Sequence, residues 1–185
     1  MGTREDLLAA AKQCLAERGY ARTTVRDIVA ASGTNLAAIN YHFGTRDKLL
    51  NQAMMESSAA AVQQILDSLP ARDTADPAMR LQDFLQQLIT SFTENHALWT
   101  ANGESLAQAL HSPELRAELG AAQERARTEL SDFFGPGAPD ARLGAVLQTM
   151  IGGLLIQHLV DPENAPTAAD ITTGLRALGA LLGGT

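Results

Sequence analysis

Residues 24–43 read TVRDIVAASGTNLAAINYHF and are the most informative part of the chain. Their pattern predicts two short helices joined by a tight turn at Gly33. Thr24 and Asn35 are each suited to cap the helix that follows, because a short polar side chain can accept a hydrogen bond from a free amide of the first turn. The second helix carries small and polar residues outward. This is the pattern of a helix-turn-helix that reads DNA.

The second helix of this pair is suited to an approach into the major groove. Small side chains let the helix backbone come close, and polar ones can reach base edges. We therefore expect Asn40 to pair with an adenine edge and Ala37 or Ala38 to contact a thymine methyl group. The i, i+3 spacing of Leu36 and Ile39 predicts that both of these side chains point inward.

Further candidate contacts are to DNA phosphates. Thr24 and Lys48 lie at the starts of predicted helices, where free backbone amides also favour an anion. Tyr41 and His42 lie at the far end of the reading helix, where they can hydrogen-bond phosphates. The residues alone leave another interpretation open, in which His42 is a core histidine and Tyr41 a packing residue.

The charge of the chain is unevenly distributed. The 185 residues carry a net charge of −7. Residues 1–50 contain seven lysine and arginine residues against five acidic ones, a balance of +2 that leaves −9 for the rest. A mildly basic head on an acidic body fits contact with DNA at one end only, with the body repelled from the phosphates.

Cysteine content and hydropathy restrict the class of protein further. Cys14 is the single cysteine, so the chain has no internal disulfide and no multi-cysteine zinc site. Its apolar neighbours predict a buried core thiol. The start of the chain, charged within residues 3–6, does not resemble a signal peptide. Residues 143–160 lack charged side chains but are barely long enough to span a bilayer, so we predict a buried helix and a cytoplasmic protein.

The rest of the chain also has helical periodicity. Hydrophobic residues make up 45% of it, and no run alternates with a period of two. We predict an all-α protein of nine helices, with Thr3 capping the first and loops at about residues 70–77 and 135–139. The expected helices cover about residues 3–19, 25–32, 36–42, 46–69, 77–95, 97–110, 113–134, 140–160 and 168–182.

Residues 3–50 resemble the DNA-binding domain of the tetracycline-repressor (TetR) family of bacterial regulators. The resemblance rests on Gly19-Tyr20, Thr23-Thr24-Val25, Arg26-Asp27-Ile28, Ala31-Ser32-Gly33, Tyr41-His42-Phe43 and Lys48-Leu49-Leu50, which match in order and spacing. It implies that four residues hold phosphates, namely Thr24, Tyr41, His42 and Lys48. It also implies that Leu36, Ala37, Ala38 and Asn40 face bases, while Ile28 and Phe43 belong to the core.

One departure from the family pattern concerns the start of the reading helix. Many relatives carry a serine cap followed by lysine or glycine, whereas this chain has Asn35-Leu36-Ala37. Asn35 still provides a cap. The departure therefore bears on which bases are read.

The resemblance implies two domains. Residues 1–50 would form the helix-turn-helix domain, and residues 51–185 a ligand-sensing and dimerisation domain, with the helix from residue 46 linking them. The resemblance also implies that this chain has the nine-helix architecture of the family.

Two apolar stripes near the end of the chain suggest a dimer. Gly152 and Gly153 would let another helix approach closely, and a four-helix interface across a two-fold axis would bury both stripes. The alternative is that both stripes are buried within one chain. The candidate interface residues are Leu143, Leu147, Met150, Ile151 and Leu154 on one helix and Leu175 and Leu178 on the last.

A ligand site is the least defined prediction. Apolar and polar side chains cluster between residues 84 and 104, which would suit a small, largely hydrophobic molecule. The alternative is that these residues are ordinary core. The candidates are Phe84, Leu88, Phe92, His96, Trp99, Asn102 and Glu104.

Together these features predict a homodimeric one-component transcriptional regulator, a repressor that binds a palindromic operator and is released by a small ligand. The alternative is a dimeric DNA-binding protein without a small-molecule ligand, controlled by a protein partner or by its abundance. We expect no enzyme, cofactor, metal or membrane partner. The histidines, His42, His96, His111 and His158, are scattered, and the chain has neither a phosphate-binding glycine loop nor a nucleophile elbow.

Overall fold

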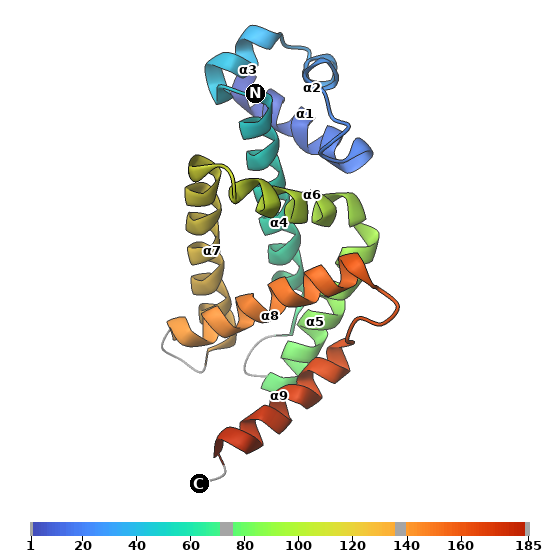
Figure 1. The fold of residues 1–185 in the computed structure, drawn as a ribbon, viewed down its shortest axis with the longest axis vertical. Coiled ribbons are helices and arrows are strands. Elements are labelled where there is room, and N and C mark those ends of the chain that lie inside the picture. The colour runs from blue at the N-terminus through green and yellow to red at the C-terminus, as the bar shows by residue number, and fades with distance from the viewer. Residues whose placement is uncertain (1, 71–75, 136–139, 184–185) are drawn as a thin grey trace. The chain divides into compact units, whose positions relative to one another are not determined.

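The computed structural model describes residues 2–70, 76–135 and 140–183, and these residues form nine α-helices and no strand (Figure 1). The predicted all-α fold is therefore confirmed. Residues 71–75 and 136–139, where the sequence predicts loops, lie outside the described residues. The helices are α1 (Thr3–Arg18), α2 (Val25–Ser32), α3 (Leu36–Phe43), α4 (Arg46–Ser68), α5 (Pro77–Glu94), α6 (His96–Ala109), α7 (Pro113–Phe134), α8 (Ala141–Val160) and α9 (Ala168–Gly183).

The caps of α2 and α3 form as the sequence predicts. The Thr24 hydroxyl accepts a hydrogen bond from the Asp27 amide at 3.3 Å, and the Thr24 amide donates to the Asp27 carboxylate at 2.8 Å. Asn35 Oδ1 accepts from the Ala38 amide at 3.0 Å. Gly33 ends α2 with φ of 66°, a left-handed conformation that glycine adopts at little cost.

The start of α1 differs from the prediction. Gly2, not Thr3, occupies the capping position, and its amide donates to Glu5 Oε2 at 3.0 Å. Thr3 is already the first helical residue. A carboxylate three residues into the helix thus satisfies the amide that precedes it, without a hydroxyl cap.

The chain divides into two compact units, which are described separately. The first unit comprises residues 1–61 and 95–122, and the second comprises residues 62–94 and 123–185. The segment 1–50, predicted to be the DNA-binding domain, lies entirely in the first unit. α6 and the first turns of α7 lie there too, and α4 and α7 each contribute residues to both units.

The core of the first unit joins α1, α2, α3 and the start of α4 (Figure 1). Cys14 is buried in it as predicted, and this burial raises the pKa of its thiol. Each fully buried leucine, isoleucine or methionine side chain contributes about 1.5–3 kcal/mol to the free energy of unfolding. The fully buried members include Leu7, Ala11, Ile28, Ile39, Leu49, Leu50 and Met54.

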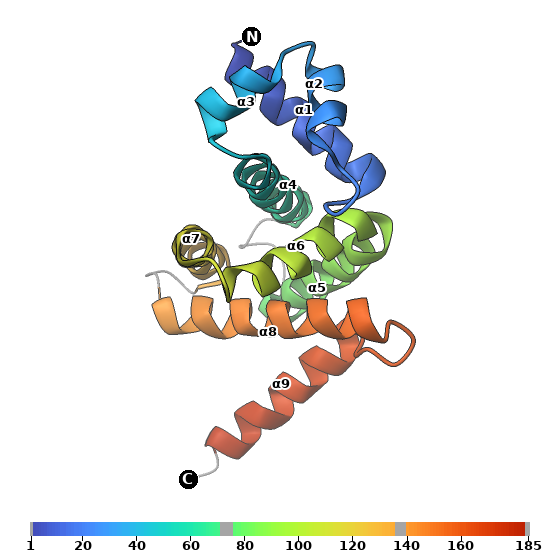
Figure 2. The ribbon, with the colours of Figure 1, turned by 45° about the horizontal axis from the view of Figure 1, so that its top comes forward.

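In the second unit, α5 presents its apolar face to α8 and α9. The face consists of Phe84, Leu85, Leu88 and Phe92, all of which are buried. α9 leaves the loop after α8 and runs obliquely to that helix (Figure 2). Thr172 of α9 donates to Gln82 of α5 at 3.3 Å, which adds a polar contact beside the apolar ones.

A close helix crossing in this unit occurs at Gly144, not at the predicted Gly152-Gly153 pair. A Cβ atom added to Gly144 would overlap the carbonyl oxygen of Arg127, so α7 and α8 touch backbone to backbone there. A Cβ atom at Gly152 or Gly153 would meet nothing within 4 Å. Of these three glycines, Gly144 is therefore the one that packing within the chain requires.

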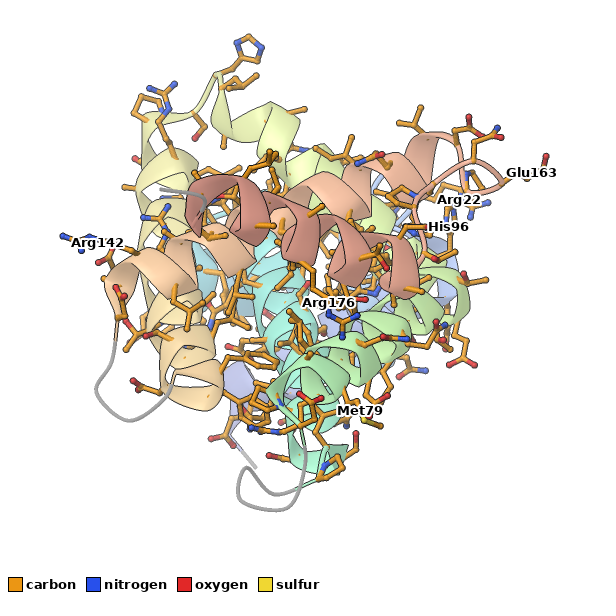
Figure 3. All side chains as sticks on the ribbon, turned by 90° about the horizontal axis from the view of Figure 1, so that it is seen from below. Arg22, Met79, His96, Arg142, Glu163 and Arg176 are labelled. Carbon is orange, nitrogen blue, oxygen red and sulfur yellow. The ribbon has the colours of Figure 1, made fainter. Side chains whose placement is uncertain are left out.

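α8 is also long and apolar enough to cross a membrane, with a mean hydropathy of 1.6, but a single such helix is weak evidence for a membrane span. Only 22% of the 18-residue apolar stretch of α8 is buried within the chain. The prediction of a buried helix is therefore wrong for most of the surface of α8. The reason is that one side of α8 packs on the other helices of the second unit, whereas its opposite side is exposed. Arg142, in the first turn of α8, and Glu163, in the loop after α8, extend away from the helices (Figure 3).

Candidate nucleic-acid interface

Helix α3 has one face buried in the core and one face exposed to solvent. Ile39 and Phe43 are buried in the core of the first unit, whereas Ala37 and Asn40 are exposed. Leu36 is 53% exposed, so its predicted inward orientation is wrong. It lies at the first position of α3, where the helix has only begun to turn over the core. The exposed face therefore carries Leu36, Ala37, Asn40 and Tyr41, with Ala38 part-buried at its edge.

Tyr41 and His42 occupy different environments at the end of α3. Tyr41 is 86% exposed, so it is not a packing residue of the core. Its ring meets the His42 ring edge to face, with 4.9 Å between ring centres. His42 is half-buried, and its ring centre lies 6.5 Å from that of Phe43. The phenol of Tyr41 is thus exposed to solvent, and its ring packs against that of the half-buried His42.

Thr24 is fully engaged in the cap of α2. Its hydroxyl donates to Asp27 Oδ2 at 2.6 Å, and its amide donates to the same oxygen. These hydrogen bonds to Thr24 hold the pKa of Asp27 below its ordinary value, with a smaller effect of Arg18, whose Nη1 lies 2.8 Å from Asp27 Oδ1. A phosphate would have to replace the Asp27 carboxylate in order to receive both donors of Thr24.

Lys48 is paired within the chain. Its Nζ lies 2.6 Å from Glu114 Oε2, at the start of α7. The hydrogen bond between them raises the pKa of Lys48 and lowers that of Glu114. Both side chains border a hollow of about 200 Å³ that is also lined by Asp47 and Glu118. The ammonium group that is expected to bind a DNA phosphate is thus in an ion pair with a carboxylate of the same chain.

Arg46 is a residue that the sequence reasoning missed. Its guanidinium donates to the carbonyl oxygens of Thr23 at 2.6 Å and Tyr20 at 2.7 Å, which joins the start of α4 to the turn before α2. A basic side chain in the first helical turn opposes the helix dipole. That unfavourable placement is a local signal that could have drawn attention to Arg46.

The residues predicted to bind a ligand are divided between the two units. Phe84, Leu88 and Phe92 lie in the second unit, where Phe84 meets Phe134 edge to face and Phe92 meets His158 at 5.9 Å between ring centres. The first unit holds the other four, and each has a different environment there. Trp99 is buried, Asn102 is part-buried, and His96 and Glu104 are exposed.

Asn102 faces α4 in the first unit. Its Nδ2 donates to Ser58 Oγ at 3.3 Å, and Ser105 Oγ, one turn later, donates to Asn51 Oδ1 at 3.3 Å. These two pairs link α6 to α4 by polar contacts. Two hollows, of about 240 Å³ and 200 Å³, are lined by none of the seven predicted ligand residues.

The predicted interface residues of α8 lie on both of its sides. Leu147 and Leu154 are 4% and 1% exposed and face the interior of the second unit, because they share the side of α8 that carries Gly144. They are therefore not available to a partner, which corrects the prediction for these two residues. The other five are exposed or part-buried, namely Leu143, Met150, Ile151, Leu175 and Leu178.

The first unit thus contains two capped helices joined at Gly33. One face of the second helix is exposed to solvent, and basic residues lie at the start of the helix that follows. These features define a helix-turn-helix DNA-binding protein.

Comparison with known proteins agrees with this class. Residues 7–53 match the family of bacterial regulatory proteins called the tetR family, and residues 77–183 match the C-terminal region of BetI-type transcriptional repressors. The chain belongs to the TetR family of transcription regulators.

Individual relatives are transcription regulators as well. The regulator BetI of Stenotrophomonas maltophilia is 31% identical over 83% of this chain and 80% of its own length. TtgR of Pseudomonas putida is 23% identical over 91% and 86%. Some matches are shorter, and the chain spans 36% of the length of AcnR from Corynebacterium efficiens.

Solved structures show the same fold. A transcriptional regulator from Streptomyces coelicolor has a TM-score of 0.67 at 25% identity, covering 95% of this chain and 96% of its own. A regulator from Saccharomonospora viridis, solved in complex with choline, has a TM-score of 0.62 at 21% identity and covers 95% and 94%. The family matches and the curated relatives are transcription regulators, so this chain is a transcription regulator that binds DNA through its helix-turn-helix.

Proposed function

We propose that the protein is a cytoplasmic homodimeric repressor that binds a palindromic operator and is released by a small, largely apolar effector. The observation that carries the dimer is the exposed apolar surface of α8 and α9. Val146, Val160 and Leu178 are 57%, 79% and 55% exposed, and Leu181 and Leu182 are more so, at 78% and 86%. A patch of this kind marks an interaction surface on a soluble protein.

A second copy of this chain is the occupant that fits this surface. Gly152 and Gly153 lie on the exposed side of α8 and meet nothing within the chain, so a second helix can approach them closely. Two chains related by a two-fold axis would each contribute α8 and α9 to a four-helix contact. The same axis would pair two copies of α3, which suits a palindrome.

The experiment for the dimer is sedimentation of the whole protein. Leu178→Glu places a charge in the exposed apolar surface and is expected to convert the dimer to monomer. The matched control is Arg176→Gln, which changes the net charge by the same amount two residues away on the same helix, at an exposed position. A wild-type protein that sediments as a monomer at about 10 µM, roughly ten times a Kd of about 1 µM, would refute the proposal.

Support for an effector comes from the relatives. The choline complex of the structural relative suggests choline as the first probe, since a quaternary ammonium group binds to the faces of aromatic rings. In this chain Arg80 already lies over the Phe133 ring, 4.4 Å from its centre. The Phe133 ring thus already has a cation of the chain itself against one face.

A thermal-shift measurement compares choline with 3,3-dimethylbutan-1-ol, its uncharged analogue of the same shape. Stabilisation by choline alone indicates a cation site, and stabilisation by both indicates an apolar one. If neither stabilises the protein and neither releases it from DNA, the alternative function gains support. In that alternative the dimer binds DNA without a small ligand and is controlled by a partner or by its abundance.

A further inference from the structure

Arg46 lies against the turn between α1 and α2. Its Nε donates to the Thr23 carbonyl at 2.6 Å, and its Nη2 donates to the Tyr20 carbonyl at 2.7 Å. The centre of its guanidinium lies 5.5 Å from the centre of the Tyr20 ring, within the range of a cation–π contact. One planar group thus holds two carbonyls three residues apart. A lysine ammonium cannot reproduce this forked geometry.

The same turn is held from its other sides. Thr23 is fully buried, and its hydroxyl lies 2.8 Å from the Gly19 carbonyl and 3.1 Å from the Cys14 carbonyl at the end of α1. The Tyr20 hydroxyl donates to Gln108 of α6 at 3.3 Å. Burial is the main cause that raises the pKa of Tyr20 to about 12, so this donor keeps its proton at physiological pH.

The residue that follows this turn is Thr24, the cap of α2. Any movement of the Thr23 carbonyl therefore moves the start of α2, and with it α3, which follows α2 after a short turn. We propose that Arg46 is a positioning residue for DNA recognition, which fixes the helix-turn-helix on the first turn of α4 and so sets the orientation of α3. This inference rests on the proposed reading of bases by α3.

A direct contact between Arg46 and DNA fits the structure less well. Its Nη1 lies 2.6 Å from Asp47 Oδ1, and its other two nitrogens bind the turn, so all three are engaged. The side chain is only 26% exposed. The charge of Arg46 is balanced by Asp47 and each of its three nitrogens makes a hydrogen bond inside the protein, as expected for a group that holds structure and does not bind phosphate.

The test compares Arg46→Lys with the wild-type protein on two DNA duplexes. One duplex is obtained by in vitro selection with the wild-type protein, and the other is a scrambled duplex of the same length and composition. Lysine keeps the charge and loses the forked contact. The control is Arg22→Lys, because Arg22 is exposed in the same turn and donates to the Arg18 carbonyl of the preceding helix, not to the turn itself.

For Arg46→Lys we expect the Kd for the selected duplex to rise about tenfold or more, since specific binding commonly exceeds non-specific binding by about 10³-fold or more. The Kd for the scrambled duplex and the slope of affinity against salt should stay close to wild type. Amide hydrogen exchange should accelerate in residues 20–28 and stay unchanged in α5. Arg22→Lys should resemble the wild type in all of these measurements.

Three results would overturn the inference. Wild-type affinity of Arg46→Lys for the selected duplex would show that the fork is unnecessary. Equal weakening on both duplexes with a smaller salt slope would show that Arg46 binds phosphate. Unchanged exchange in residues 20–28 would show that the turn is held without it.

If Arg46→Lys does not fold by circular dichroism, the same measurements are made with Arg46→Gln. A wild-type protein that selects no sequence contradicts the proposed base reading and not the role of Arg46.

Discussion

At the scale of single residues, several side chains of the DNA-binding unit are occupied within the protein. Thr24 gives both of its donors to Asp27, Lys48 is paired with Glu114, and Arg46 binds two carbonyls. Asn40 and Tyr41 on α3 are instead exposed. We therefore expect base preference to depend on α3 and the strength of binding to depend on how readily the occupied groups exchange partners.

The first prediction separates these two effects. Asn40→Ala should lower the affinity for the selected duplex by about 5- to 100-fold, the cost of a lost two-point contact with a base, and leave scrambled DNA almost unaffected. Lys48→Ala should weaken binding to both duplexes alike and reduce the salt slope by about one. Fluorescence anisotropy at several salt concentrations measures both. If Asn40→Ala weakens both duplexes equally, the reading face of α3 has been assigned wrongly.

The second prediction concerns the Thr24–Asp27 cap. The pKa of Asp27 is lowered by its hydrogen bonds to Thr24, so the stabilisation from the carboxylate is complete above the ordinary value of 3.8. It is lost as the pH falls through the lowered pKa. The stability difference between wild type and Asp27→Asn should therefore be constant near neutral pH and shrink below pH 3.8, measured by urea unfolding.

Asp170 supplies a matched control in the second unit. Thr167 and Asp170 form the same cap at the start of α9, with the Thr167 hydroxyl 2.7 Å from Asp170 Oδ2 and the pKa of Asp170 lowered by it. Asp170→Asn should show the same pH dependence. Only Asp27→Asn should weaken DNA binding at pH 7. Equal DNA binding by the two variants would mean that the cap of α2 does not affect recognition.

At the scale of helices, the sequence predicts most boundaries because the signals are local. Gly33, Asn35 and Pro113 each act within one turn, and each helix end forms within a few residues of the predicted position. Contacts between distant residues give no such signal. Arg46 with Thr23 and Lys48 with Glu114 depend on how helices meet, so spacing along the chain could not reveal them.

Glycine shows the same limit of sequence reasoning. The adjacent glycines Gly152 and Gly153 suggest a site where another helix approaches closely. The close crossing within the chain instead depends on the single Gly144. Gly144→Ala should destabilise the protein by about 1–3 kcal/mol because α7 and α8 must separate. Gly120→Ala, where a Cβ meets nothing within 4 Å, should stabilise it by up to about 1 kcal/mol. Thermal unfolding of both variants checks this, and equal stability of the two would contradict the crossing.

The ion pair between α4 and α7 leads to the last prediction. Glu114 occupies Lys48, so removal of its charge should strengthen DNA binding by about two- to fivefold at low salt, as expected for an exposed pair. The control is Glu118→Gln, which removes the same charge from the same helix. Glu118 is suitable because Lys48 forms its ion pair with Glu114. Glu114→Gln should have a larger effect than Glu118→Gln, and that excess should disappear when Lys48 is alanine. An effect of equal size in both variants would indicate a general charge effect.

At the scale of the whole molecule, one chain supplies a single reading helix and an exposed apolar surface on α8 and α9. A short helix contacts few base pairs, whereas two related by a dyad read a longer, symmetric site. The body is acidic, with a balance of −9 for residues 51–185, which keeps it off the phosphates. Dimerisation and sequence recognition are therefore expected to depend on each other.

In vitro selection of duplexes from a randomised library by the wild-type protein tests this account most directly. We predict that the recovered sequences contain two inverted half-sites, with centres about 34–36 Å or somewhat more apart. They should be recovered poorly by Leu178→Glu, which is designed to be monomeric. Recovery of a single unrepeated motif, or equal recovery by the wild type and Leu178→Glu, would contradict the two-fold reader.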